Sequence, residues 1–258
     1  MSIQSIVILG SGNVATVLGM ALKEAGLTIA CVYSRNMAHA KTLANQLQTA
    51  FTNQLHAIPP GADLYILAVK DEALSEISGE LSVNGIVSHT SGATPLNVLK
   101  KHKRAGVFYP LQTFNKNTGT DLLQVPFLIE SSSPGDEIVL LELAKKLSNT
   151  AIPATSQQRQ GLHVAAVFAN NFTNHLLVVS KQIMDASGLP FELLKPLIQQ
   201  TINNALANDP ATVQTGPAMR YDHQTIQSHL QLLGTNPDAE KIYRLITESI
   251  QRFHPEKP

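Results

Sequence analysis

The first residues of the chain that could do chemistry form a glycine-rich turn. Residues 10–15 read Gly-Ser-Gly-Asn-Val-Ala, after a short apolar run and before a helical pattern. In a strand–turn–helix unit the first glycine permits the tight turn, and the second lets the backbone approach a pyrophosphate. The helix start offers free N–H groups and a favourable dipole to the anion. The turn therefore predicts a dinucleotide site, the alternative being a glycine-rich turn that binds nothing. Its expected contacts are Gly10, Ser11, Gly12, Asn13 and Val14.

The end of the second predicted strand is where dinucleotide-binding proteins read the adenosine ribose, usually with an acid for NAD. This chain has no acid there and reads Tyr-Ser-Arg-Asn at 33–36. Ser34 and Arg35 could instead hydrogen-bond a 2′-phosphate, which suits a planar guanidinium. We therefore expect NADP rather than NAD, with Arg35 as a solvated surface charge the alternative. Ala68 and Val69 follow the third strand at the same edge and are also expected near the cofactor.

Polar side chains also follow the fourth predicted strand, where the sequence reads His-Thr-Ser-Gly at 89–92. Because strand carboxyl ends line the ligand crevice of open α/β folds, these side chains should face a bound nicotinamide. Ser91 could hold a carboxylate or carbonyl oxygen, and His89 could donate a proton to an alkoxide. Alternatively, His89 simply ends the strand and Ser91 caps the helix that follows.

The elements that must position these residues alternate strands and helices over the first 155 residues or so. Most predicted strands are uninterrupted apolar runs, typical of a parallel sheet covered by helices on both faces. The beginning of the chain is βαβαβ, which predicts an α/β domain with a doubly wound Rossmann sheet. The strands are predicted at Ser5–Leu9, Ile29–Tyr33, Leu64–Val69, Ile86–His89, Gly106–Tyr109, Pro126–Glu130 and Ala151–Pro153, and the helices at Val14–Ala25, Ala38–Leu47 and Glu137–Ser148.

The rest of the chain shows helical periodicity and almost no strand signal. A long apolar helical pattern runs from Gln160 to Ser187, where Gly188 and Pro190 end it. We therefore predict an all-α domain at 156–258 after a nucleotide-binding domain at 1–155. Further amphipathic stretches follow the long helix at Phe191–Leu206, Thr225–Leu233 and Pro237–Arg252.

Composition excludes several classes of protein. The 258 residues include 19 Lys and Arg against 19 Asp and Glu, so no global field attracts nucleic acid or an anionic membrane. The single cysteine, Cys31, excludes an internal disulfide and a cysteine-based zinc site, and we expect no metal. The N-terminal apolar run soon reaches Gly10, which favours a strand over a signal peptide. No segment has about 18 uninterrupted apolar residues, so we expect a cytoplasmic protein without a membrane span.

Four segments give the chain a resemblance to a known superfamily. Together they resemble the NADP-dependent β-hydroxyacid dehydrogenases and pyrroline-5-carboxylate reductases, and more closely the branch with a Rossmann-like domain and a C-terminal domain of unknown function. The resemblance implies a pyridine nucleotide cofactor and a helical domain that forms homodimers; a deazaflavin would also suit the fold. The segments are GSGNVA at 10–15, HTSG at 89–92, YPLQTF at 109–114 and TGPAMRYD at 215–222, with His229.

The long helix departs from this resemblance at one position. The dehydrogenases have a catalytic lysine three residues before an Asn-Asn pair, whereas here Val167 stands three residues before Asn170. A valine cannot transfer a proton. One helical turn earlier, His163 projects from nearly the same face, and an imidazole ordinarily titrates near neutral pH. We therefore expect His163 to replace the lysine and Asn170 to contact substrate, unless His163 is a packed structural residue.

The segment at 215–222 is similar in placement to the turn with which pyrroline-5-carboxylate reductases hold a substrate carboxylate. Thr215 and Gly216 would present free N–H groups to the anion, and Arg220 would add a bidentate cation. Asp222 could orient Arg220 or cap the next helix. The alternative is an internal salt bridge between two helices.

These residues favour an NADP-dependent oxidoreductase that transfers a hydride between nicotinamide and a small carbonyl, imine or hydroxy compound bearing a carboxylate. An alternative from another class is a nucleotide-sensing protein that kept the Rossmann turn and lost turnover, as the missing lysine allows.

Overall fold

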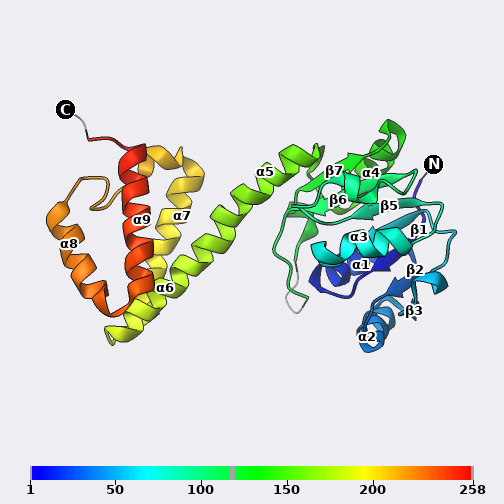
Figure 1. Cartoon of the computed structure of the whole chain (residues 1–258), viewed down its shortest axis with the longest axis horizontal. Coiled ribbons are helices and arrows are strands. Elements are labelled where there is room, and N and C mark those ends of the chain that lie inside the picture. Colours follow the sequence, from blue (N-terminus) through cyan, green and yellow to red (C-terminus); the bar gives the residue numbers. More distant parts are fainter. Residues whose placement is uncertain (1, 117–119, 257–258) are drawn as a thin grey trace. The chain divides into compact units, whose positions relative to one another are not determined.

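The computed structural model describes residues 2–116 and 120–256, which form two compact units, Met1–Phe168 and Ala169–Pro258. The first unit is built on one eight-stranded sheet with helices on both faces (Figure 1). The expected fold class, a Rossmann-like sheet followed by helices, is confirmed. Its main elements are β1 (Ser5–Leu9), α1 (Asn13–Glu24), β2 (Thr28–Tyr33), α2 (Met37–Leu47), β3 (Ala50–Thr52), β4 (Leu64–Leu67), α3 (Asp71–Glu80), β5 (Ile86–His89), β6 (Ala105–Pro110), β7 (Phe127–Ser131), α4 (Pro134–Leu147), β8 (Ala151–Pro153) and α5 (Ser156–Ala166).

The strands lie in the order β3-β2-β1-β4-β5-β6-β7-β8. The first six run parallel, and their register pairs Leu9 with Tyr33 and Leu67, and Leu67 with His89. The carboxyl ends of β1, β2, β4 and β5 therefore lie level at one edge of the sheet. Parallel α/β sheets bind their ligands at this edge, and the loops that leave it carry the residues singled out by sequence.

The structure differs from the sequence prediction in three elements. Strand β7 runs antiparallel to β6, because a buried apolar run does not encode strand direction. The three-residue β3 is largely exposed and α3 opens with two acids, so neither gave a strong apolar pattern. The bounds of β1, β5 and β8 agree with the prediction.

Both faces of the sheet are buried under helices. Alternate residues of the central strands point to opposite sides, so Ile8 joins a core with Leu18 of α1 and Leu140 of α4. Leu9 points the other way and packs in a core with Leu74 of α3. This two-sided burial explains the uninterrupted apolar strands, since a half-exposed strand would alternate in polarity.

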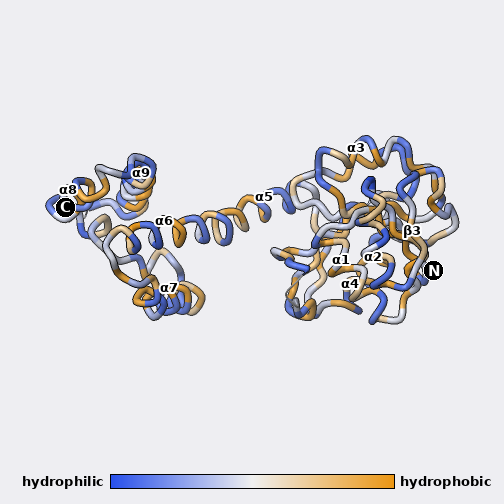
Figure 2. The backbone as a smooth tube through the Cα atoms, turned by 90° about the horizontal axis from the view of Figure 1, so that it is seen from below, coloured by the Kyte–Doolittle hydropathy of each residue, from blue (hydrophilic) through white to orange (hydrophobic). Residues whose placement is uncertain are grey.

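The second unit consists of helices. It contains α6 (Thr173–Ala186), α7 (Lys195–Ala207), α8 (His223–Leu232) and α9 (Pro237–Phe253). Hydrophobic residues recur along these helices (Figure 2). Many in this unit are more than a third exposed, among them Leu193 in the short 3-10 turn Phe191–Leu194 before α7, and Leu197, Leu206, Leu232 and Phe253. A monomeric soluble domain seldom leaves so many large apolar side chains in water.

A single helical run from Ser156 to Ala186 crosses the boundary between the units, with a π-helical segment at Val167–Phe172. It begins at a capping box of Thr155 and Gln158, four residues before the predicted start. The units divide between Phe168 and Ala169, so α5 belongs to the first unit, although the sequence suggested a boundary at 155. Within the described residues, this run is long and apolar enough to span a membrane. A helix that packs against a partner chain can have the same length and composition.

Candidate functional site

Gly10 leaves β1 in a backbone conformation that favours glycine. Its φ is +129°, and its N–H donates to the Tyr33 carbonyl at 2.8 Å. A Cβ on Gly10 would lie 2.1 Å from the carbonyl oxygen of Ala68, so the glycine also allows the ends of β1 and β4 to approach. Ala68 donates its N–H to the Leu9 carbonyl at 2.7 Å, and Val69 follows half-buried. Backbone conformation and packing within the protein therefore require a glycine at position 10.

At position 12, neither backbone conformation nor packing requires a glycine. Its backbone is extended, with φ −81°, which any residue adopts, and a Cβ there would meet no protein atom within 4 Å. Gly12 is the N-cap of α1 and supplies no side-chain cap, whereas Asn36, Ser133 and Thr155 cap α2, α4 and α5. An uncapped helix start with open space in front suits a bound anion.

Beside this turn lies a cavity of about 390 Å³. The Ser11 hydroxyl donates to the Ser34 hydroxyl at 2.9 Å, which ties the end of β1 to the end of β2. Arg35 follows with an exposed side chain. The structure thus brings three of the predicted cofactor residues to one edge of the sheet. The cavity is lined by Ser11, Gly12, Thr16, His39, Thr42, Leu43, Gln46 and Lys116.

Asn13 has a different use from the predicted one. Its side-chain amide donates to the Phe114 carbonyl at 2.9 Å and accepts from the Lys116 N–H at 3.4 Å. The side chain therefore tethers the loop after β6 to the start of α1, which leaves the backbone N–H groups of Asn13 and Val14 for an anion. The half-buried Val14 side chain packs on the core.

Ser91 holds a turn after β5. Its hydroxyl accepts the N–H groups of Ala93 at 3.2 Å and Thr94 at 2.9 Å and contacts the Thr94 hydroxyl at 3.0 Å. The Ser91 side chain is nearly buried, and its hydrogen-bonding capacity is used within this turn. The geometry therefore does not favour a side chain that contacts substrate. It also differs from the capping alternative, because the helical turn at Leu96–Leu99 begins at Pro95 without a side-chain cap and Ser91 closes the turn before it.

His89 is fully buried at the end of β5. Its Nδ1 accepts the Ser91 N–H at 3.2 Å. Burial lowers the pKa of His89 to about 3, and the nearby Arg159 charge acts in the same direction. The ring is therefore neutral at physiological pH and closed off from solvent. The structure does not support the proton-donor role suggested by sequence, because a buried neutral imidazole has no path to substrate.

His163 lies close to Tyr109 and Gly92, two residues at the edge of the sheet. Its Nδ1 is 3.3 Å from the hydroxyl of Tyr109 on β6, with the rings at 70°. Gly92 lies beside both, since a Cβ there would come within 2.7 Å of His163 Nδ1 and 2.8 Å of the Tyr109 hydroxyl. The His163 side chain is half-buried, so it remains accessible at the edge where ligands bind in this fold.

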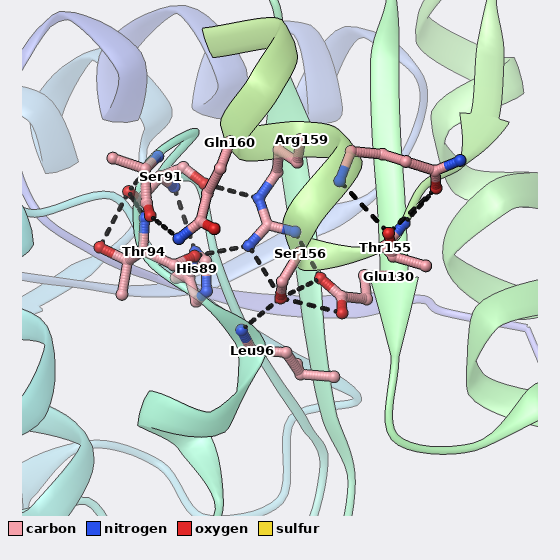
Figure 3. A network of polar contacts seen from close by, with 11 residues as sticks. His89, Ser91, Thr94, Leu96, Glu130, Thr155, Ser156, Arg159 and Gln160 are labelled. Carbon is pink, nitrogen blue, oxygen red and sulfur yellow. Dashed lines mark hydrogen bonds and ion pairs between the residues drawn. The ribbon is translucent and has the colours of Figure 1, made fainter. Parts of the chain in front are cut away.

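A buried arginine connects these loops to the long helix (Figure 3). The Arg159 side chain is 0% exposed; it forms an ion pair with Glu130 on β7, and its Nε donates to the Ser91 carbonyl at 3.2 Å. Its other amino group donates to the Thr94 carbonyl. The Ser156 hydroxyl donates to Glu130 at 2.8 Å. The network fixes the first turn of α5, and His163 follows one helical turn after Arg159.

Sequence reasoning missed Tyr109, Glu130 and Arg159. One signal was available, because Arg159 and His163 are four residues apart and therefore share a helix face. Tyr109 was noted only as part of the segment at 109–114, and neither it nor Glu130 near the end of β7 gave a local sign of its partner. Their partners are 54 and 29 residues away in the chain.

The second unit holds the remaining candidates. Asp222 caps α8 by accepting the Thr225 N–H at 3.0 Å, which is one of the two predicted roles, and this bond lowers the pKa of its carboxyl. Arg220 is exposed and has no ion pair among residues 120–256. Thr215 and Gly216 border a cavity of about 300 Å³ with mostly aliphatic walls.

Asn170 does not follow the periodicity used to predict it. It lies within the π-helical segment, where each turn holds more residues than in an α-helix, so its direction relative to His163 changes. The prediction that His163 and Asn170 share one helix face assumed an uninterrupted α-helix, which the π-helical segment interrupts. Single π turns inside α-helices occur often at functional sites.

The comparisons with known proteins agree with this architecture. Residues 2–113 match the Rossmann-like domain model, and residues 125–250 match the domain of unknown function DUF2520. The "putative NADP oxidoreductase BF3122" from Bacteroides fragilis is 39% identical, covers 96% of this chain and 98% of its own, and has a TM-score of 0.88. The chain belongs to the family that joins a Rossmann-like domain to DUF2520. None of the curated proteins matches it.

More distant solved structures share the fold of this family. An imine reductase from Myxococcus stipitatus in complex with NADP+ is 15% identical over 97% of this chain and 95% of its own, with a TM-score of 0.67. A 1-pyrroline-5-carboxylate reductase from Streptococcus pyogenes is 14% identical over 96% and 98%, with a TM-score of 0.63. These neighbours are oxidoreductases.

Proposed function

We propose that this protein is an NADP-dependent oxidoreductase that transfers a hydride between nicotinamide and a small carbonyl, imine or hydroxy compound bearing a carboxylate. The observation that carries the proposal is Gly12. Gly12 is the N-cap of α1 but has no side chain that could cap the helix, and a Cβ there would meet no protein atom within 4 Å. Neither its backbone conformation nor its packing requires a glycine at this position. A pyrophosphate at that position accounts for both features. The NADP-named structures of similar fold support the same reading.

The residues present fit an NADP molecule. The N–H groups at the start of α1 would bind the pyrophosphate, and Ser34 and Arg35 would bind the 2′-phosphate. The cavity beside Ser11 and Gly12 leaves room next to the phosphates. When bound, the nicotinamide exchanges a hydride with the substrate carbon.

His163 is the residue we assign to proton transfer at the substrate heteroatom. It is half-buried rather than closed off, unlike His89, and lies one turn after a rigid anchor, Arg159. We assign the substrate carboxylate to Arg220 with the N–H groups of Thr215 and Gly216, and Asn170 to a further polar contact. An exposed guanidinium without an ion pair in the described chain suits a carboxylate ligand.

A second candidate is a nucleotide sensor without turnover. Val167 favours it, because an aliphatic side chain stands where the resembling dehydrogenases carry their lysine acid. Wild-type protein that oxidises bound NADPH in the presence of a keto or imino acid supports the enzyme. Tight NADPH binding without turnover, unaffected by His163→Ala, supports the sensor.

Arg35→Ala is expected to weaken NADPH binding by about tenfold to 100-fold and to leave NADH binding unchanged. A charged hydrogen bond to the 2′-phosphate contributes about 1.5–3 kcal/mol, and NADH has no such group. Calorimetric titration with both cofactors measures the effect. Lys41→Ala, which removes another exposed cation from α2, is the control and should change neither affinity. Equal losses for NADPH and NADH would contradict the assignment.

We further propose that the helical unit forms a homodimer. Leu193 and Leu197 lie one turn apart and are 61% and 64% exposed, and a second copy of the chain would cover them. Light scattering should give about twice the 27.9 kDa of the monomer. Leu197→Glu should shift the mass toward one chain, because burying an unpaired carboxylate is costly. Leu123→Glu, at an exposed position of the first unit, should not. A monomeric wild type would reject the dimer.

A further inference from the structure

The contact between Tyr109 and His163 links a strand of the sheet to the helix that follows it. Tyr109 is the penultimate residue of β6 and is 9% exposed. Its hydroxyl is 3.3 Å from Nδ1 of His163, and this is its one polar contact that the structure gives within the described part of the chain. The pair lies at the carboxyl edge of the parallel strands, where the proposed cofactor would bind.

The direction of this hydrogen bond follows from burial. Burial raises the pKa of the Tyr109 phenol above its usual range, so the hydroxyl keeps its hydrogen at neutral pH. A buried O–H needs an acceptor, and His163 Nδ1 is the nitrogen within reach. The phenol therefore donates to Nδ1. A neutral imidazole whose Nδ1 accepts a hydrogen bond carries its own hydrogen on Nε2.

The glycine at position 92 leaves room for this contact. A Cβ there would lie 2.7 Å from His163 Nδ1 and 2.7 Å from Cζ of Tyr109. No left-handed backbone requires a glycine at this position. Gly92 is thus the residue that lets the phenol and the imidazole meet, and the buried Arg159 network holds the same turn through the Ser91 carbonyl.

We propose that Tyr109 is a positioning and proton-relay residue that acts through His163, an inference that rests on the proposed function. The phenol holds the imidazole with its Nε2–H directed away from the sheet and toward the substrate. As an alkoxide or amide anion forms on hydride delivery, the Nε2–H bond breaks and a substrate O–H or N–H bond forms. The Tyr109 O–H bond breaks and Nδ1–H forms, so the ring stays neutral. Nδ1 later returns this proton to the phenolate while water protonates Nε2, which restores the starting tautomer.

The charge of Arg159 supports this relay. The buried guanidinium lowers the pKa of Tyr109 against the larger effect of burial. It therefore stabilises the phenolate that the relay leaves behind. Arg159 is paired with Glu130 and forms no hydrogen bond to the Tyr109 hydroxyl. It therefore acts on the phenolate through its charge and not through a hydrogen bond.

Nitrogen NMR of histidine-labelled protein tests the geometry, with His163→Gln to assign the resonance. We expect wild-type Nδ1 to show the shift of an unprotonated nitrogen that accepts a hydrogen bond. Tyr109→Phe and Gly92→Ala should each move it to the shift of an unbonded nitrogen. An Nδ1 that is protonated in the neutral wild-type ring, or a resonance unchanged in Tyr109→Phe, would overturn the proposal.

Kinetics test the relay, with 1-pyrroline-5-carboxylate and a panel of keto acids plus ammonia as probes. Tyr109→Phe should lower kcat about tenfold, the worth of one hydrogen bond, with KM and NADPH affinity unchanged. Tyr65→Phe is the matched control, because it removes a buried hydroxyl that bonds only near Pro59 and Ala62, and it should retain the wild-type kcat.

The two proposals fail in different ways. An unchanged kcat in Tyr109→Phe would overturn the relay and leave the oxidoreductase standing. NADPH binding without turnover of any probe by the wild type would overturn the relay together with the enzyme and support the sensor. Failure of the wild type to bind NADPH would overturn the proposed function itself, whereas the NMR measurement would still decide the Tyr109 contact.

Discussion

Gly12→Val is expected to weaken NADPH binding by about 100-fold or more while the thermal unfolding temperature stays close to that of the wild type. A Cβ at this position would meet no protein atom within 4 Å, so we expect the fold to accommodate the substitution. The pyrophosphate, however, could no longer approach the helix N–H groups. The loss corresponds to about 2.7 kcal/mol of binding free energy or more. Fluorescence titration with NADPH and calorimetric unfolding measure the two quantities.

Gly10→Ala is the matched contrast to Gly12→Val. Its methyl group would collide with the Ala68 carbonyl and occupy a backbone conformation with φ +129°, so it should destabilise the first unit. The two glycines of one motif thus separate binding from stability. A Gly12→Val protein that binds NADPH as the wild type does would show that the open space serves no phosphate, and the proposed function would lose its main support.

Arg159→Met is expected to lower the free energy of unfolding by about 3–5 kcal/mol. The substitution keeps a long apolar stem but leaves Glu130 partly buried without its cation, and the Ser91 and Thr94 carbonyls without their donor. Removing one partner of a buried ion pair has a cost of this size. Urea denaturation followed by circular dichroism measures the change, and amide exchange in β5 and β7 should locate it.

Two further variants make the Arg159 experiment specific. Arg244→Met breaks an exposed pair with Glu240 on α9 and should cost only about 0.3–0.5 kcal/mol. Adding Glu130→Gln to Arg159→Met should recover part of the lost stability, because no uncompensated charge then remains. A loss in Arg159→Met as small as that in Arg244→Met would mean that water reaches the pair and that the network does not anchor α5.

Several features of this protein were predictable from local sequence. The Gly10 and Gly12 spacing after an apolar strand, the missing acid beside Arg35, and the change from strand to helix patterns all involve neighbours within a few residues. Such patterns reflect backbone sterics and two-sided burial, which act locally. The Rossmann-like domain, its helical extension and the family resemblance were therefore predictable from the sequence.

Other features depended on contacts between distant segments. Tyr109 meets His163 across 54 residues, and Arg159 meets the Ser91 carbonyl across 68. His89 and Ser91 had the right types for catalysis, yet one is sealed in the sheet and the other closes its own turn.

By itself the sequence predicted most strands of the sheet, the glycine-rich turn and NADP rather than NAD, since each depends on residues adjacent in the chain. Only the tertiary structure decided which polar side chains are buried or hydrogen-bonded within the fold and which remain accessible to a substrate. The physical reason is that burial and hydrogen-bond partners set whether an imidazole or hydroxyl can exchange a proton, and both are properties of the packed chain.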